Sequence, residues 1–162
     1  MLFRYKQVQE VISLPPEKLS SIREHINQLL QKEVGNSSAE GIITDISDVS
    51  DIKSLFISRV NGHSHFRVHY WKELIKPEEG SIYTAHVDRI YEEGLFCSIH
   101  NIDILIPAPR MVNWHFNGQC VTKYFQHSKG KRISVGDDVR LRVIAVRYDK
   151  KYQCLADLIF GD

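Results

Sequence analysis

The chain has 162 residues, of which 43% are hydrophobic and 25% are charged, and its formal net charge is +1. These values are typical of a soluble globular protein, and they exclude wholesale disorder and a strongly basic chain. Residues 1–79 hold 10 basic and 11 acidic side chains, whereas residues 80–162 hold 11 and 9. The second half is therefore slightly favoured for any contact with phosphate.

The cysteines and the N-terminus indicate the compartment. Cys97, Cys120 and Cys154 are odd in number and widely spaced, which argues against a disulfide framework and fits a reducing environment. The first ten residues, MLFRYKQVQE, lack the apolar run of a signal peptide, and no apolar stretch is long enough to cross a bilayer. We expect a soluble intracellular protein with no membrane partner.

The residue pattern at the start of the chain predicts a strand followed by a helix. Residues 2–14 mix apolar and polar side chains as a strand does, and Pro15 and Pro16 end it. Apolar side chains then recur in steps of three and four and define one helical face, formed by Leu19, Ile22, Ile26, Leu29, Leu30 and Val34. Gly35 ends the helix.

From Gly41 the pattern is that of strands. Short β runs are expected at residues 42–46, 55–60 and 65–74, with the acidic stretch 45–51 as a turn or exposed connection. Asn61-Gly62 is a strong hairpin signal between the last two runs. Because a helix packed on one face of an antiparallel sheet buries both apolar surfaces, we expect the helical face to be core.

The segment 76–80, Lys-Pro-Glu-Glu-Gly, predicts a boundary between a domain at 1–79 and a second at 80–162. After it the chain is almost entirely β. Strands are expected at residues 82–90, 95–99, 102–106, 139–147 and 152–158. Five strands with a long connection between the third and the fourth are typical of a small closed barrel of the OB type.

That long connection, residues 109–130, is predicted to be irregular, with a short helix or strand at most. Long loops inside compact domains are uncommon unless they are functional or mobile. Trp114 and Phe116 are large side chains that a barrel does not obviously need, so we expect them to be exposed and to bind a protein partner. The alternative is a loop folded over one end of the barrel.

No catalytic constellation is found, and we expect a protein that is not an enzyme and has no cofactor. No nucleophile with a nearby base and no glycine-rich phosphate loop is present. His63, His65 and His69 share one strand face, and with Cys97 and His100 they are conceivable metal ligands. No Cys/His pair repeats at zinc spacing, so we expect no metal site.

The second half resembles the S1-motif OB domain. The residues that carry this likeness are Glu93-Gly94-Leu95-Phe96, an isoleucine-rich strand ending in Pro107, and the turn Val135-Gly136-Asp137-Asp138-Val139. The first half, with Leu14-Pro15-Pro16 before the helix, Gly41, and Phe66-Arg67-Val68-His69-Tyr70, is similar to a truncated ribonucleoprotein-like tip domain. Together the halves resemble the OB-fold stalk subunit of multisubunit RNA polymerases, the seventh-subunit family and its archaeal counterpart. Residues 102–107, Ile-Asp-Ile-Leu-Ile-Pro, are most similar to the RNA polymerase III version.

This resemblance implies an α+β tip domain followed by an all-β OB-fold barrel. It also implies a non-catalytic component of a nuclear RNA polymerase, or of a cytoplasmic or virion enzyme if the host is a virus. The expected partners are a small helical stalk subunit, the polymerase clamp and single-stranded RNA. The alternatives are the RNA polymerase II stalk subunit and a free-standing OB-fold protein of translation or RNA decay.

The RNA site is predicted on the barrel. Single strands are held by aromatic faces that stack on bases and by cations that follow phosphates. Phe96 occupies the aromatic position of the S1 pattern, and the expected RNA-binding set is Phe96, Arg89, Tyr91, Arg142, Lys131 and Arg132. For Phe96 the alternative is packing inside the barrel. Pro107 replaces the polar residue that the family usually has near the end of strand three.

Overall fold

The computed structural model describes residues 3–119 and 121–160, which divide into two compact units. One unit takes the described residues up to Asn36 together with Glu40–Lys76. The other takes Ser37–Ala39 and the described residues from Pro77 onward. Leu2, at the start of the first predicted strand, and Cys120 lie outside the described residues.

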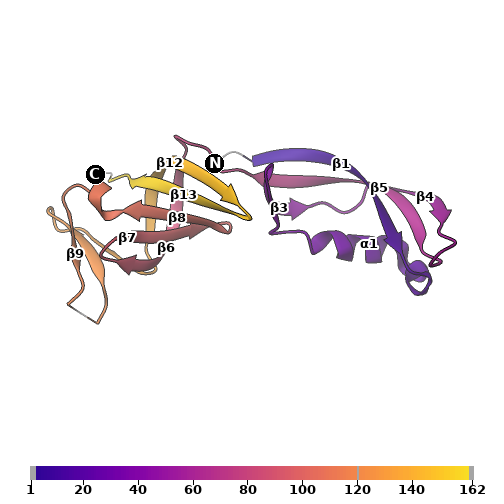
Figure 1. Ribbon diagram of the computed structural model, residues 1–162, viewed down its shortest axis with the longest axis horizontal. Coiled ribbons are helices and arrows are strands. Elements are labelled where there is room, and N and C mark those ends of the chain that lie inside the picture. The colour runs from indigo at the N-terminus through magenta and orange to yellow at the C-terminus, as the bar shows by residue number, and fades with distance from the viewer. Residues whose placement is uncertain (1–2, 120, 161–162) are drawn as a thin grey trace. The chain divides into compact units, whose positions relative to one another are not determined.

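The first unit is a sheet with one helix (Figure 1). Its long strand β1 (Phe3–Leu14) pairs antiparallel with β5 (Ser64–Ile75) along the whole length of both. The other edge of β5 pairs with β3 (Gly41–Ile46) and with β4 (Asp51–Ile57). The predicted hairpin at Asn61-Gly62 joins β4 to β5 and is confirmed, with Gly62 at a positive φ of 74°.

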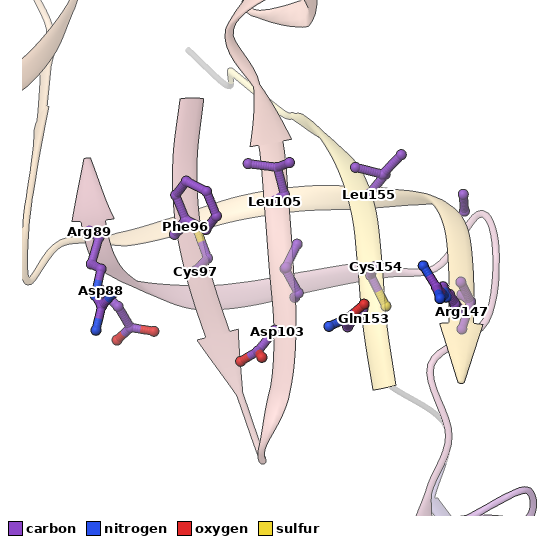
Figure 2. A pocket seen from close by; sticks show the side chains of 13 residues that line it. Asp88, Arg89, Phe96, Cys97, Asp103, Leu105, Arg147, Gln153, Cys154 and Leu155 are labelled. Carbon is purple, nitrogen blue, oxygen red and sulfur yellow. The ribbon is translucent and has the colours of Figure 1, made fainter. Parts of the chain in front are cut away.

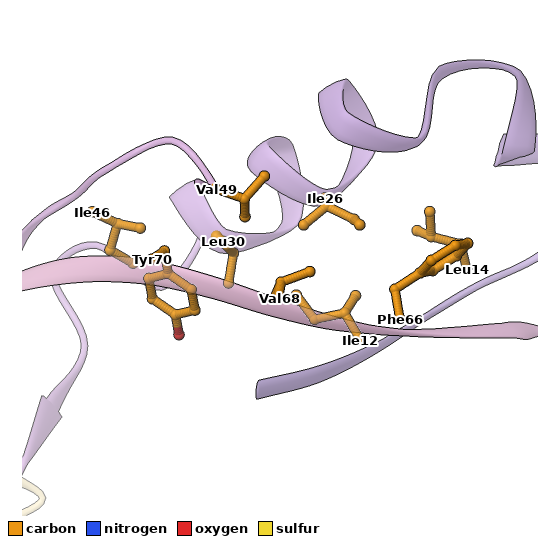
Figure 3. Close-up of a cluster of buried hydrophobic side chains, with 9 residues drawn as sticks. All are labelled: Ile12, Leu14, Ile26, Leu30, Ile46, Val49, Phe66, Val68 and Tyr70. Atoms are coloured by element: carbon orange, nitrogen blue, oxygen red, sulfur yellow. The ribbon is translucent and has the colours of Figure 1, made fainter. Parts of the chain in front are cut away.

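The predicted helix is present but begins as a 3₁₀ turn. The 3₁₀ helix η1 (Pro16–Ser21) has a proline in its first positions, and α1 (Ile22–Gln31) follows it. Side chains of α1 buried against the sheet are Ile26 and Leu30, with Leu19, Ile22 and Leu29 partly buried beside them. Figure 3 shows the core of this unit between α1 and the inner face of β1 and β5. The expectation that the helical face is core is confirmed for its members from Leu19 to Leu30, whereas Val34 lies beyond the end of α1 and is 38% exposed.

Polar side chains of α1 hold the connection between β3 and β4. Asn27 Oδ1 accepts a hydrogen bond from the backbone N–H of Val49 at 3.0 Å, and Gln31 Nε2 donates to the carbonyl of Ile46 at 2.8 Å. Val49 itself is buried. The acidic segment that the sequence predicted as a turn or an exposed connection is therefore attached to the helix through its backbone.

The second unit contains a closed barrel of five strands. They are β6 (Ile82–Tyr91), β7 (Gly94–Ile99), β8 (Ile102–Pro107), β12 (Asp138–Asp149) and β13 (Lys151–Leu158). The order around the barrel is β12-β13-β8-β7-β6, and β12 closes it by pairing antiparallel with β6. The predicted fold class, an α+β half followed by a five-stranded barrel, is confirmed.

Alternation along the barrel strands separates its inside from its outside. Buried and outward-facing side chains alternate along most of these strands, and the buried set includes Val87, Leu95, Cys97, Ile104, Ile106, Leu141, Val143, Cys154 and Ala156. Because successive side chains of a strand point to opposite faces, the residues between these project outward. Bulges between Val87 and Arg89 and between Val143 and Ala145 interrupt the register.

The connection between β8 and β12 is more ordered than the sequence predicted. It begins with the 3₁₀ helix η2 (Ala108–Arg110) and contains β9 (Trp114–Asn117), β10 (Tyr124–His127) and β11 (Arg132–Ser134). These strands form an antiparallel sheet in the order β11-β10-β9. We call residues 108–134 the insertion.

The unit also includes β2 (Ser37–Ser38). The hydroxyl of Tyr148 donates a hydrogen bond to the carbonyl of Ser37 at 3.2 Å, and that of Tyr152 donates to the carbonyl of Ser38 at 2.6 Å. Two tyrosines of the last hairpin thus satisfy backbone acceptors of a segment far away in the sequence.

Candidate nucleic-acid interface

A row of outward-facing side chains crosses the barrel. Strand pairing places Arg89 opposite Phe96, Phe96 opposite Leu105, and Leu105 opposite Leu155, and Leu155 is in turn opposite Ala145. Figure 2 shows Phe96, Leu105 and Leu155 lying next to one another on three neighbouring strands. Phe96 is 39% exposed and Leu155 is 40% exposed, so the row is an apolar stripe in contact with solvent.

A second outward row is polar. Each of its members lies two positions away, on the same strand, from a member of the first row. The second row joins Ser98, Asp103, Gln153 and Arg147 in register. Apart from Ser98, the members of the two rows line a groove of about 770 Å³. The groove therefore has an apolar side and a polar side.

The bulge in β6 determines which charges reach this groove. Asp88 lies in the bulge between Val87 and Arg89, and both Asp88 and Arg89 are exposed although they are adjacent. Without the bulge, alternation would send one of the two side chains to the inside. Both Asp88 and Arg89 line the groove beside Phe96.

The charged lining of the groove is balanced. The lining contains two acidic side chains, Asp88 and Asp103, and two basic ones, Arg89 and Arg147. Asp103 and Arg147 each also pair with a charged residue outside the lining. Lys151 Nζ lies 2.9 Å from Asp103 Oδ2, and Arg147 Nη2 lies 3.8 Å from Asp149 Oδ2. Exposed pairs of this kind are weak and screened by salt, so they can open to a ligand.

Tyr91 extends the aromatic side of the site at the end of β6. Its ring meets the Phe96 ring edge to face, with centroids 5.4 Å apart and an interplanar angle of 84°. Lys123 Nζ of the insertion lies 5.6 Å from the centroid of Tyr91. Both rings are more than one third exposed. An exposed pair of rings at right angles can stack one base and contact the edge of the next.

The structure groups three of the six predicted RNA-binding residues and places the others elsewhere on the unit. Arg89, Tyr91 and Phe96 lie together. Arg142 is exposed on β12 opposite Asp157, beyond the lining of the groove. A bidentate contact from Arg110 holds the pKa of the Asp157 carboxyl below its usual range.

The two remaining predicted residues, Lys131 and Arg132, belong to the insertion. Lys131 Nζ lies 5.4 Å from the centroid of Phe160, and the Arg132 guanidinium lies 4.5 Å from that of Tyr124. Neither lines the groove. Their contact with RNA stays a prediction.

The expectation that Trp114 is exposed is wrong. Trp114 is only 9% exposed because its ring packs edge-on against His127 and Phe160, at centroid distances of 5.0 and 5.6 Å. Phe116 is half-buried and packs on Phe125 at 5.5 Å. These aromatic side chains form a small core for the insertion, so the sheet that contains them needs them for its own stability. Binding of a protein partner by Trp114 and Phe116 stays a prediction. For Trp114 the expected solvent exposure, on which that prediction was based, is absent.

Sequence reasoning missed Leu105, Leu155 and Gln153. The signal for them was strand parity, since each lies directly beside a buried residue, Ile104 or Cys154, and so must face outward. Two apolar side chains at outward positions of neighbouring strands mark a surface that is built for contact.

The two buried thiols in the barrel, Cys97 and Cys154, are unreactive near neutral pH. Burial raises the pKa of Cys97 to about 12, with Asp88 adding to the effect, and burial raises the pKa of Cys154 to about 11. A thiol with such a pKa carries almost no thiolate near neutral pH and is a poor nucleophile. These cysteines therefore serve the packing of the barrel.

Among the histidines considered as metal ligands, His65 has other contacts. His65 Nδ1 is 2.8 Å from Ser13 Oγ, and its ring stacks on Phe56 at 4.4 Å. Within residues 3–119 and 121–160, no group of three or more His, Cys, Asp or Glu side chains is arranged to hold a metal ion. In the same ranges, no helix combines the length and apolar character needed to span a membrane.

Comparison with protein families identifies the barrel. Residues 76–156 match the model of the S1 RNA binding domain. The chain belongs to the S1 RNA-binding domain family. The match includes residues of all five barrel strands and the whole insertion. The apolar row and the groove therefore lie within the S1 domain. Comparison with curated proteins finds no significant match.

Proposed function

We propose that this chain is a non-catalytic RNA-binding protein that holds single-stranded RNA in the groove of its S1 domain. The observation that carries the proposal is the exposed row of Arg89, Phe96 and Leu105 across neighbouring strands. In this arrangement a base stacks on Phe96, the edge of Tyr91 contacts its neighbour, and Arg89 faces a phosphate.

The lining of the groove supports tolerance of RNA sequence. Apolar and aromatic surfaces accept any base because every base has a π face. Asp103 and Gln153 on the polar row supply an acceptor and an amide for base edges or ribose hydroxyls. Because acidic and basic lining residues are balanced, stacking contributes more to affinity here than phosphate neutralisation does.

The variant Phe96→Ala tests the groove. Loss of one stacking platform costs about 1–3 kcal/mol, which corresponds to a roughly 5- to 150-fold rise in Kd for single-stranded RNA. The measurement is fluorescence anisotropy with a labelled oligonucleotide at fixed salt. Phe56→Ala is the matched control, because Phe56 is also an exposed phenylalanine, at 58%, but belongs to the other unit. An equal Kd for both variants would remove the groove as the RNA site.

We further propose that the protein acts as the stalk subunit of a DNA-directed RNA polymerase, most like that of RNA polymerase III. What supports this is the order of the two parts, a helix-on-sheet half followed by an S1 barrel, together with the resemblance of Leu14-Pro15-Pro16 and residues 66–70 to the tip domain. In this role it pairs with a small helical subunit, docks on the clamp, assists initiation and receives emerging RNA. Its place is the nucleus, or the cytoplasm or virion for a viral enzyme. Co-expression with candidate stalk partners tests this role.

Two alternatives remain as rivals of the stalk role. They are the stalk subunit of RNA polymerase II and a free-standing S1 protein of translation or RNA decay. Both share the groove, so only the identity of the protein partners separates them from the first.

A further inference from the structure

The S1 groove can stack bases but has no surplus of positive charge. Its two arginines are offset by two aspartates, and Glu92 and Glu93 follow Tyr91 in the turn to β7. A single strand that leaves the groove past Tyr91 carries one negative charge per nucleotide into this acidic turn. Binding there requires a cation from another part of the unit.

Lys123 is placed to supply that cation. Its Nζ lies 5.6 Å from the centroid of Tyr91, and Tyr91 in turn lies 5.4 Å from Phe96. Phe96, Tyr91 and Lys123 thus form a continuous series from the groove to the insertion. Lys123 is exposed, so its ammonium group is accessible to a phosphate while it lies over the Tyr91 ring.

The insertion holds Lys123 on a supported strand end. Lys123 immediately precedes β10, which is the central strand of the three-stranded sheet and pairs on both sides. Phe125 of β10 is buried, and His127 at its other end stacks on Phe160 with centroids 4.2 Å apart. Strand β10 is held by pairing at both edges and by the buried side chain of Phe125. The backbone next to Lys123 is therefore well supported.

We infer that Lys123 is a phosphate-binding residue that lengthens the RNA site beyond the barrel groove, so that the strand passes over Phe96 and Tyr91 and its next phosphate meets Lys123. This inference rests on the proposed RNA function of the groove. It assigns to the insertion the role of a second wall for the RNA path. The ligand class is single-stranded RNA without sequence preference, because the contact is made to phosphate.

The test compares Lys123→Ala with Lys129→Ala on short and long oligouridine. Lys129 is an exposed lysine of the same insertion and serves as the matched control. Probes of about 4 and about 12 nucleotides bracket the lengths that single OB folds take up. Loss of one phosphate contact reduces the salt slope of log K by about 0.7, which is roughly a 5-fold rise in Kd at 0.1 M salt. We expect this loss for Lys123→Ala on the long probe alone, unchanged affinity for Lys129→Ala, and recovery in Lys123→Arg.

Three outcomes would overturn the inference. Equal Kd values for Lys123→Ala and Lys129→Ala on the long probe would exclude a special role for Lys123. Equal losses on both probes, accompanied by a lower melting temperature, would mean that the lysine only anchors the insertion on Tyr91. Wild-type protein that binds neither probe would overturn both the inference and the proposed function. By contrast, a loss in Phe96→Ala with Lys123→Ala unaffected would reject Lys123 as a phosphate contact and retain the groove as the RNA site.

Discussion

Phe96 and Trp114 are both large aromatic residues of the S1 unit, and the structure gives them opposite roles. Phe96 lies on the outer face of β7, whereas Trp114 is packed among His127 and Phe160. The S1 pattern suggested Phe96 as an RNA contact but left packing inside the barrel open, and the structure places it outside, between the buried Leu95 and Cys97. No comparable pattern surrounds Trp114, because its partner Phe160 is distant in the sequence and only the folded chain brings the two together.

Gly94 is the residue at which the barrel depends most on the absence of a side chain. It begins β7 at a φ of 151°, and a Cβ there would collide with the backbone carbonyl of Ile106 on β8. We expect Gly94→Ala to lower the free energy of unfolding by about 1–3 kcal/mol from backbone strain, and by more once β7 and β8 move apart. Urea denaturation followed by fluorescence measures the change.

Gly130→Ala is the control for that substitution. Gly130 also has a positive φ, 99°, but a Cβ there would meet no atom within 4 Å. The Gly94 variant should therefore lose more stability than the Gly130 variant. Equal losses would mean that strain in φ alone, and not the close approach of β8, explains the glycine at the start of β7.

At the scale of elements, the barrel strands were predictable and the insertion was not. The five barrel strands alternate over 6–12 residues and are separated by turns such as Glu92-Glu93 and Asp149-Lys150, which period-two patterning detects. The strands β9, β10 and β11 have only 3–4 residues each, which is too short for alternation to stand out. Strands that short are defined by their partners rather than by their own sequence.

The same reasoning applies to the site. The bulge that turns both Asp88 and Arg89 outward leaves no trace in a hydrophobicity pattern, so the charge balance of the groove could not be predicted. Likewise, the contact between Lys123 and Tyr91 joins residues on separate elements. The residues of one strand were predictable from alternation, and the residues that complete the site from elsewhere were not.

The insertion should depend on Trp114 for its stability. Truncation of a buried tryptophan typically costs about 3–5 kcal/mol, whereas an exposed side chain far from special features changes stability by about 0.5 kcal/mol or less. We expect Trp114→Ala to unfold at clearly lower urea concentration than wild type, and Val112→Ala, at a site that is 74% exposed, to match wild type. A wild-type midpoint for Trp114→Ala, combined with loss of a protein partner, would support the original partner role instead.

For the whole molecule, the order of the parts was predictable from sequence because each part has its own periodicity. Steps of three and four indicated the helix of the first unit, and alternation indicated the sheet and the barrel. The family match covers residues 76–156 and so concerns the barrel unit.

Co-expression is the experiment suited to the polymerase proposal. If the chain is a stalk subunit, one candidate helical partner should co-elute with it at equal stoichiometry and raise its soluble yield, because two small units gain buried area from a partner. Tagged protein from its own host should also recover large polymerase subunits. Recovery of ribosomal or RNA-decay components in their place would favour the free-standing alternative and contradict the stalk role.

The barrel contains one parallel pairing, in which β13 lies along β8 through Gln153, Cys154 and Leu155. These residues pair with Asp103, Ile104 and Leu105, about fifty positions earlier in the chain, across the whole insertion. A pairing of such long sequence separation can form only after the whole intervening chain is present, and its loop-closure entropy slows it. During synthesis the S1 groove therefore remains open until its last strand has left the ribosome, and Leu155 and Gln153 complete it in one step. A nascent chain has no finished RNA site, which delays RNA binding until the unit has folded.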